Sequence, residues 1–164
     1  MILGVDPGTY ITGYGIIKWV NGIWKAIDFG CIKPPKSMKL SERYLEIHQG
    51  IDQLIDMYSP EVLVVETQYV HKNIQSAIKL GMARGVIMLS AKKKGLKVFE
   101  YAPAKAKKAI VGHGHATKRQ VQSMTQHLLG LDALPEPEDA ADALALALCH
   151  AYASNCAQLM GEEV

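Results

Sequence analysis

Four carboxylates stand at places in this sequence where they could act together. Two short apolar runs each end on a lone carboxylate, Asp6 in one and Glu66 in the other, while Asp139 and Asp142 lie three positions apart. Four such groups brought together would repel each other strongly unless cations lay between them, and hard oxygen ligands suit Mg²⁺ or Mn²⁺. The pattern therefore predicts phosphate chemistry assisted by two metal ions.

The elements expected around these residues could bring them together. The carboxyl end of a buried strand is where open α/β sheets place their ligands, so Asp6 and Glu66 would meet if their strands are parallel neighbours. Asp139 and Asp142 share one face of the helix expected over 138–153, which could pack its Ala-Leu stretch onto the sheet. Acids near a helix N-terminus also suit the helix dipole, so a purely structural role for this pair stays open.

The remaining periodicities predict one α/β layout. We expect strands over 2–6, 13–20, 23–32, 62–66 and 96–101, and helices over 40–57, 73–93, 103–110, 117–129 and 138–153. Asn21-Gly22 is a strong hairpin signal between the second and third strands. Three strands joined by hairpins, followed by two separated by helices, predict a mixed five-stranded sheet flanked by helices. We expect one domain over residues 1–155 and a short tail over 156–164.

The net charge of +2 hides a strong asymmetry. The 48 residues from Lys72 to Arg119 contain 12 of the 18 basic residues and a single acid, Glu100, a net charge of +11. Mixed surfaces usually intersperse their signs, so a segregated basic segment indicates a polyanionic partner, and nucleic acid fits best. For Lys92–Lys94 alone, a solvated helix face is the simpler interpretation.

The composition indicates the class of protein and the compartment in which it is expected to work. The chain has 49% hydrophobic and 21% charged residues, which is typical of a globular protein. No apolar stretch approaches the ~20 residues of a membrane span, and the N-terminus lacks a basic region, so we expect neither a membrane anchor nor a signal peptide. Cys31, Cys149 and Cys156 form an odd, scattered set, which favours a reducing cytoplasm over a disulfide framework.

Ordered motifs from Ile2 to about His150 carry a resemblance to one family. They are Asp6-Pro-Gly, Thr12-Gly-Tyr-Gly, Glu66, Lys72-Asn73, Ser76-Ala77, Lys79-Leu-Gly, Ala83-Arg-Gly, Glu100-Tyr-Ala, Lys107, Val111-Gly-His-Gly, Lys118, Gln120-Val and Asp139-Ala-Ala-Asp-Ala-Leu-Ala. In these the sequence resembles the Holliday junction resolvase RuvC family. The resemblance implies a ribonuclease H-like fold and a homodimeric, metal-dependent endonuclease that nicks two opposed strands of a four-way DNA junction.

The resemblance also implies roles for single residues. Asp6, Glu66, Asp139 and Asp142 occupy the four positions whose carboxylates hold the catalytic metals, with two Mg²⁺ ions per site expected, or Mn²⁺ in their place. Lys107 and Lys118 match family lysines near the scissile strand, where a cation could offset charge developing on the phosphate. The products would be a 5′-phosphate and a 3′-hydroxyl. Taken singly, each carboxylate has an ordinary alternative, such as Asp6 capping the turn that follows it.

Further residues are predicted to contact DNA. Tyr69 takes the place of a family aromatic, usually phenylalanine, that stacks on a base at the opened junction centre; its alternative role is partly buried loop packing. The basic segment and its histidine pair supply the other predicted contacts, which are Lys72, Lys79, Arg84, Lys105, Lys108, His113, His115 and Arg119.

The helix expected over 73–93 is apolar around much of its circumference. One face would cover the sheet, and Gly81 and Gly85 would allow a close backbone approach on another. Complete burial within one chain is the alternative, while the resemblance favours a twofold dimer through this helix. The family also implies the branch-migration proteins RuvA and RuvB as partners.

Three rival classes can be weighed on the sequence. A phosphotransferase or ATPase of the actin-like superfamily also opens with Asp-x-Gly-Thr, but that fold needs a second, duplicated domain for which 164 residues leave no room. A non-catalytic DNA-binding module would be marked by loss of a metal carboxylate, and all four are present. A ribonuclease H-like nuclease acting on RNA in hybrids is the closest enzymatic rival.

Overall fold

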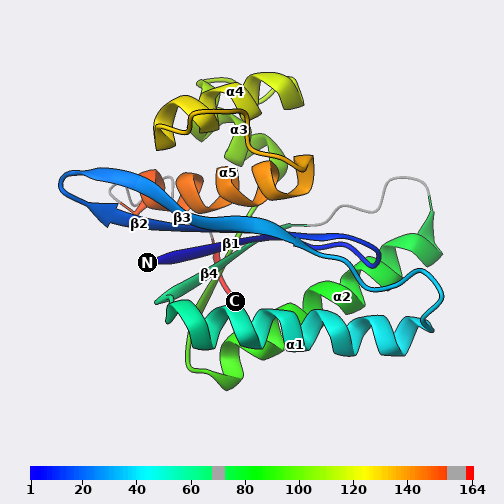
Figure 1. The fold of residues 1–164 in the computed structure, drawn as a ribbon. Coiled ribbons are helices and arrows are strands. Elements are labelled where there is room, and N and C mark those ends of the chain that lie inside the picture. The colour runs from blue at the N-terminus through cyan, green and yellow to red at the C-terminus, as the bar shows by residue number, and fades with distance from the viewer. Residues whose placement is uncertain (68–72, 155–161) are drawn as a thin grey trace.

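The computed structural model describes residues 1–67, 73–154 and 162–164. Figure 1 shows a central sheet with helices on both faces. The six strands are β1 (Ile2–Asp6), β2 (Thr12–Val20), β3 (Ile23–Ile32), β4 (Val62–Glu66), β5 (Lys97–Tyr101) and β6 (Glu162–Glu163). The five helices are α1 (Leu40–Tyr58), α2 (Ile74–Lys93), α3 (Pro103–Val111), α4 (Lys118–Leu129) and α5 (Glu138–Ala153).

The sheet is mixed, in the spatial order β3-β2-β1-β4-β5-β6. The pairs β1–β4 and β4–β5 are parallel, and the remaining pairs are antiparallel. Val5 pairs with Val65, so the next residues along these two parallel strands, Asp6 and Glu66, leave the sheet at the same edge. The condition under which Asp6 and Glu66 would meet, parallel pairing of the first and fourth strands, is therefore fulfilled.

Helices cover the two faces of the sheet unequally. On one face α1 and α2 pack over Leu3, Val5 and other apolar strand residues. On the other face α5 lies directly on the sheet, and α3 and α4 form a further layer outside it (Figure 1). Strands buried from both sides read as continuous apolar runs, which explains the sequence of β1 and β4.

Glycines in β1 and β2 let α5 approach the sheet at backbone distance. A Cβ on Gly4 would overlap the carbonyl oxygen of Ala143, and one on Gly13 would overlap that of Asp139. No other residue type leaves this space free, because every other side chain begins with a Cβ. The first turns of α5 are thereby held against the ends of β1 and β2.

The sheet has one strand more than the five predicted. β6 pairs antiparallel with β5, Glu163 opposite Phe99 and Glu162 opposite Glu100, in a segment that the sequence assigns to a tail. Two glutamates show no alternation, and glutamate is depleted in strands, so the sequence carries no signal for this pairing. The predicted helices and other strands match the structure to within a residue or two at each end.

The structure bears on the predictions made for the cysteines and for membrane spans. Cys31 and Cys149 are free thiols, and Cys156 lies outside the described residues. In the part of the chain that the structure describes, no helix is long and apolar enough to cross a membrane.

Candidate active site

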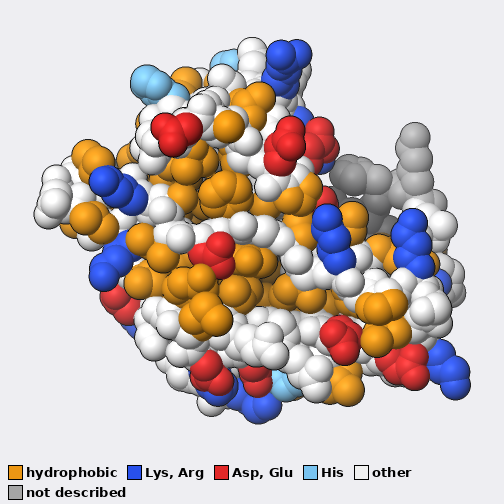
Figure 2. Space-filling model, in the orientation of Figure 1, with side chains coloured by type: hydrophobic (Ala, Val, Ile, Leu, Met, Phe, Trp, Pro, Cys, Tyr) orange, Lys and Arg blue, Asp and Glu red, His pale blue; other side chains and the backbone are white. Residues whose placement is uncertain are grey.

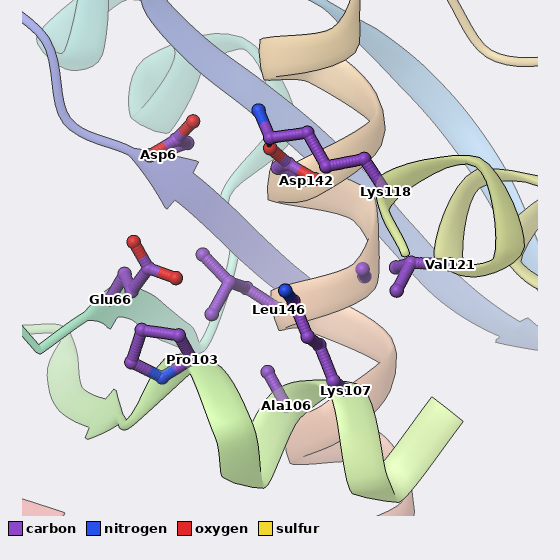
Figure 3. Close-up of a pocket in the computed structure, with 10 residues that line it drawn as sticks. Asp6, Glu66, Pro103, Ala106, Lys107, Lys118, Val121, Asp142 and Leu146 are labelled. Atoms are coloured by element: carbon purple, nitrogen blue, oxygen red, sulfur yellow. Dashed lines mark ion pairs between the residues drawn. The ribbon is translucent and has the colours of Figure 1, made fainter. Parts of the chain in front are cut away.

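A hollow of about 360 Å³ opens at the edge of the sheet where β1 and β4 end. Figure 3 shows Asp6 and Glu66 facing Asp142 and two lysines across it. The full lining consists of Asp6, Glu66, Pro103, Ala106, Lys107, Lys118, Val121, Asp142, Ala145 and Leu146. Polar groups converge here on an apolar floor, as is typical of a functional site.

Each carboxylate reaches the hollow because of the element that carries it. Asp6 and Glu66 are the last residues of two neighbouring parallel strands, and Asp142 projects from α5, which lies over them. Asp139, one turn earlier on α5, sits beside Gly13, the partner of Asp6 in the sheet: a Cβ on Gly13 would be 2.9 Å from the Asp139 Cβ. The structure therefore brings three of the predicted carboxylates to one hollow, and the fourth, Asp139, lies near enough for its charge to act on Asp6.

The carboxylates disturb one another electrostatically. The pKa of Asp6 is raised from 3.8 to about 7, first by burial and then by the negative charges of Glu66, Asp142 and Asp139, against a smaller lowering effect from Lys118. Burial also raises the pKa values of Glu66 and Asp142. Removal of carboxylates from water and repulsion between like charges both disfavour the ionised form. The site as folded thus carries more negative charge than its own cations compensate.

Two lysines supply the local positive charge. The ammonium of Lys118 lies 3.3 Å from the Asp142 Oδ2 and 3.4 Å from the Glu138 Oε2, and Asp142 raises the pKa of Lys118. Lys107 and Lys118 both oppose the pKa rise of Glu66. Lys107, on α3, lines the hollow from the side opposite Asp6 (Figure 3). Both predicted lysines therefore lie where the carboxylates converge.

The chemistry of these donors fits hard divalent cations. All four candidate ligands are carboxylates, which Mg²⁺ and Mn²⁺ prefer, and their unfavourable mutual repulsion would be relieved by bound positive charge. Within residues 1–67, 73–154 and 162–164, no three Asp, Glu, His or Cys side chains close on a single point as a preformed cluster. The carboxylates line an open hollow instead, which is wide enough to admit a ligand together with cations.

Apart from Arg84, the other predicted DNA contacts fall into three groups. Five of them are exposed side chains, namely Lys79, Lys108, His113, His115 and Arg119. Lys105 is half-buried, with its ammonium 5.5 Å from the centre of the Tyr101 ring. Tyr69 and Lys72 lie outside the described residues.

Arg84 differs from the rest of the predicted contacts. Its side chain is half-buried and forms an ion pair with Glu100 on β5. That pair would have to break before the guanidinium could bind a phosphate. Glu100 is the only acid in the basic segment, so it is an evident candidate partner for one of the basic residues. The sequence does not show that its partner is Arg84.

Glu138 and the apolar floor of the hollow were not predicted from the sequence. Glu138 is the second carboxylate beside Lys118, and only the packing of α4 against α5 brings these two residues together. The apolar floor made by Pro103, Ala106 and Val121 was also not predicted. Each of these looks like an ordinary helix-start or core residue in the sequence, so no local signal marks it.

The strand order, the covering helices and the acidic edge define this protein as a ribonuclease H-like α/β protein. The sequence model of the family described as "Crossover junction endodeoxyribonuclease RuvC" matches residues 2–150. A protein of that name from Protochlamydia amoebophila is 63% identical over 151 residues, 92% of this chain and 90% of that protein. One from Caldicellulosiruptor saccharolyticus is 43% identical over 164 residues, 99% of both chains. The chain belongs to the RuvC family.

Solved structures agree with this assignment. The chain of Thermus thermophilus RuvC in complex with a Holliday junction substrate superposes with a TM-score of 0.92 at 30% identity, covering 99% of this chain and 98% of that one. The yeast mitochondrial Holliday junction resolvase Ydc2 superposes with a TM-score of 0.66 at 14% identity, over 96% of this chain and 81% of that one, and so shares the fold.

The raised pKa of Asp6 predicts a specific pH dependence of stability. A carboxyl group whose pKa is 3.8 when unfolded and about 7 when folded favours the folded state below pH ~4, and this contribution is lost as the pH rises through 7. Without divalent cations, Asp6→Asn should therefore be more stable than the wild type at pH 8, by roughly 1–4 kcal/mol, with the difference shrinking toward pH 4.

Urea denaturation in EDTA at pH 4.5 and pH 8 measures this difference. Asp132→Asn, at an exposed carboxylate away from the hollow, is the matched control and should change stability little at either pH. A variant Asp6→Asn that is less stable than the wild type at pH 8 would contradict the repulsion assigned to the site.

Proposed function

We propose that this protein is a metal-dependent endonuclease that resolves four-way DNA junctions by paired symmetric nicks during recombination and repair. The observation that carries the proposal is the acidic, lysine-flanked hollow at the end of β1 and β4. It occurs in a chain that matches, over nearly its whole length, a protein whose structure holds a Holliday junction substrate.

The carboxylates of Asp6, Glu66, Asp139 and Asp142 would hold the divalent cations, Mg²⁺ or Mn²⁺. Bound there, such cations supply an activated water and offset negative charge on the phosphate and the departing oxygen. The protein holds four carboxylates at one edge of the sheet, where their ionisation lowers the stability of the folded state. Bound cations would relieve this repulsion, so the arrangement favours cation binding.

The two lysines would act on the substrate. Lys118 is held over the hollow by Asp142 and Glu138, so its ammonium is already oriented toward the space that a phosphate would occupy. Its raised pKa keeps it protonated at neutral pH. Lys107, on α3, also faces Glu66 and Asp6 across the hollow (Figure 3). A preorganised cation aimed at a developing negative charge lowers the barrier more than one that must be repositioned.

A symmetric junction cut on two strands calls for two active sites, and α2 offers a surface for a second copy. Its outward positions recur at i, i+4, i+7, i+8, i+11 and i+15, which is one face of a helix. That face consists of Ile74, Ile78, Gly81, Met82, Gly85 and Leu89. The four large side chains are each more than half exposed, and nothing lies within 4 Å of the Cβ positions of the two glycines. We propose that two copies pair through this face about a twofold axis.

Family membership supports the remaining parts of the proposal. Proteins RuvA and RuvB, which move the branch point, are the proposed partners, and the cytoplasm is the proposed location. Tyr69 is proposed to stack on a base at the junction centre.

A cleavage assay on end-labelled substrates tests the proposed function. A four-way junction, a linear duplex of matching sequence and an RNA–DNA hybrid would each be incubated with the protein and Mg²⁺. Paired nicks in opposed strands of the junction alone support the proposal, whereas cleavage of the hybrid alone would assign the protein to the ribonuclease class.

Glu66→Gln should abolish cleavage while leaving junction binding within a few-fold of the wild type. The substitution preserves shape but removes a charged oxygen ligand, and loss of a cation site affects the chemical step rather than recognition. Gel-shift binding in EDTA and cleavage in Mg²⁺ measure the two effects separately. Cleavage at the wild-type rate would exclude Glu66 from the site.

Ile78→Asp should convert the protein to a monomer and uncouple the two nicks, because it puts a charge at the centre of the proposed contact. Ile23→Asp, at a similarly exposed isoleucine that begins β3, is the matched control and should remain dimeric. Light scattering after gel filtration gives the mass, and circular dichroism checks the fold. A dimer that survives Ile78→Asp would rule out α2 as the interface.

A further inference from the structure

A second basic surface lies just past Asp6, on the side of the sheet away from α5. The turn joining β1 to β2 carries Tyr10, whose ring is half exposed and stands against the guanidinium of Arg43 on α1. The Arg43 Cζ lies 4.2 Å from the ring centre, so one face of the ring is covered by a cation. About half of the Tyr10 surface stays accessible to solvent.

Two further lysines line a depression beside this ring. The depression, of about 590 Å³, is lined by Tyr10, Ile11, Lys33, Pro34 and Lys36. Figure 2 shows Lys and Arg side chains on this side of the molecule, where β3 leads into α1. The pKa of Tyr10 is lowered, first by a hydrogen bond and the charge of Arg43, and then by the charges of Lys79 and Lys36. Cations from three separate parts of the fold therefore act on a single ring.

These cations are not neutralised by the protein. Within the part of the chain that the structure describes, none of Lys33, Lys36, Arg43 and Lys79 forms an ion pair, and the Arg43 Nε is buried without a hydrogen-bond partner. Arg84, Lys94 and Lys118 pair with carboxylates, but the cations beside Tyr10 do not, and they act together on one ring. Exposed cations gathered beside one ring create a positive potential that attracts an anionic ligand.

The position of this surface relative to the active site suggests what that anion is. Tyr10 is four residues after Asp6, in a turn closed by a hydrogen bond of 2.8 Å from the Thr12 hydroxyl to the Gly8 carbonyl oxygen. Consecutive Cα atoms are about 3.8 Å apart, so the Tyr10 and Asp6 Cα atoms are at most about 15 Å apart. Tyr10 therefore lies within the length of roughly four nucleotides of a DNA strand from Asp6.

We propose that Tyr10, Lys33, Lys36 and Arg43 form a second DNA-contact surface, which holds the strand that runs from the catalytic hollow toward α1. Phosphates bind between the lysines and Arg43, and a base or sugar packs on the open face of Tyr10. This inference rests on the proposed function. It adds a contact that the charge asymmetry of the sequence misses, because these residues lie outside the basic segment from Lys72 to Arg119.

Salt-dependent binding of a labelled four-way junction in EDTA tests the phosphate contacts. Each phosphate contact contributes about 0.9 to the slope of log affinity against log salt, so Lys33→Gln with Lys36→Gln should reduce the slope by nearly 2 and weaken binding ~10–30-fold at 150 mM salt. Lys18→Gln with Lys25→Gln removes the same charge from a cross-strand pair on the β2–β3 hairpin and is the matched control. It should change binding less than twofold.

The ring is tested separately. Tyr10→Ala should weaken junction binding by about fivefold or more, whereas Tyr10→Phe, which keeps the ring, should bind as the wild type does. If the wild type binds and cuts the junction while the double lysine variant matches its control, the second surface is excluded and the proposed function stands. If the wild type neither binds nor cuts, the proposed function fails and this inference fails with it.

Discussion

The structure depends on holding four carboxylates at one edge of a sheet against their mutual repulsion. Burial and like charge both raise the pKa of Asp6, to about 7, so the folded state bears a cost that hydrophobic packing must offset. The helices that supply this packing lie close to the sheet and to one another. Glycines in β1 and β2 let α5 rest on the sheet through backbone contacts, and α3 and α4 press on α5 from outside. These layers fix the backbone positions from which the carboxylates project.

This constraint explains the distribution of positive charge around the site. Lys118 neutralises part of the acidic cluster by pairing with Asp142 and Glu138. Lys107 lines the same hollow, and its charge acts on Glu66. The remaining negative charge suits divalent cations, and the unpaired cations beside Tyr10 suit a polyanion that passes over them. A DNA strand bound across the edge of the sheet would meet both requirements at once, with its scissile phosphate at the acids and its flanking phosphates at the lysines.

Much of this arrangement could be predicted from local sequence. Apolar runs ending on Asp6 and Glu66 predict strand ends, and the three-residue spacing of Asp139 and Asp142 predicts a shared helix face. The helix boundaries could be predicted because capping residues lie within one turn of the helix end. For instance, the Thr117 side chain accepts a hydrogen bond from the backbone N–H of Gln120.

What could not be predicted depends on contacts between distant segments. The pairing of Arg84 with Glu100, and the meeting of Tyr10 with Arg43, arise only when helices dock on the sheet. Strand β6 forms because its backbone reaches the free edge of β5, with no help from its side chains. In each case the sequence contains both partners but no periodic pattern that joins them.

If the four carboxylates form one site for divalent cations, Mn²⁺ should bind among them. Anomalous scattering from a crystal of the protein soaked in MnCl₂ measures this, since Mn²⁺ scatters anomalously and accepts the same oxygen ligands as Mg²⁺. We expect two anomalous peaks between Asp6, Glu66, Asp139 and Asp142. Peaks only elsewhere, or none at saturating Mn²⁺ with Lys118 still paired to Asp142, would contradict it.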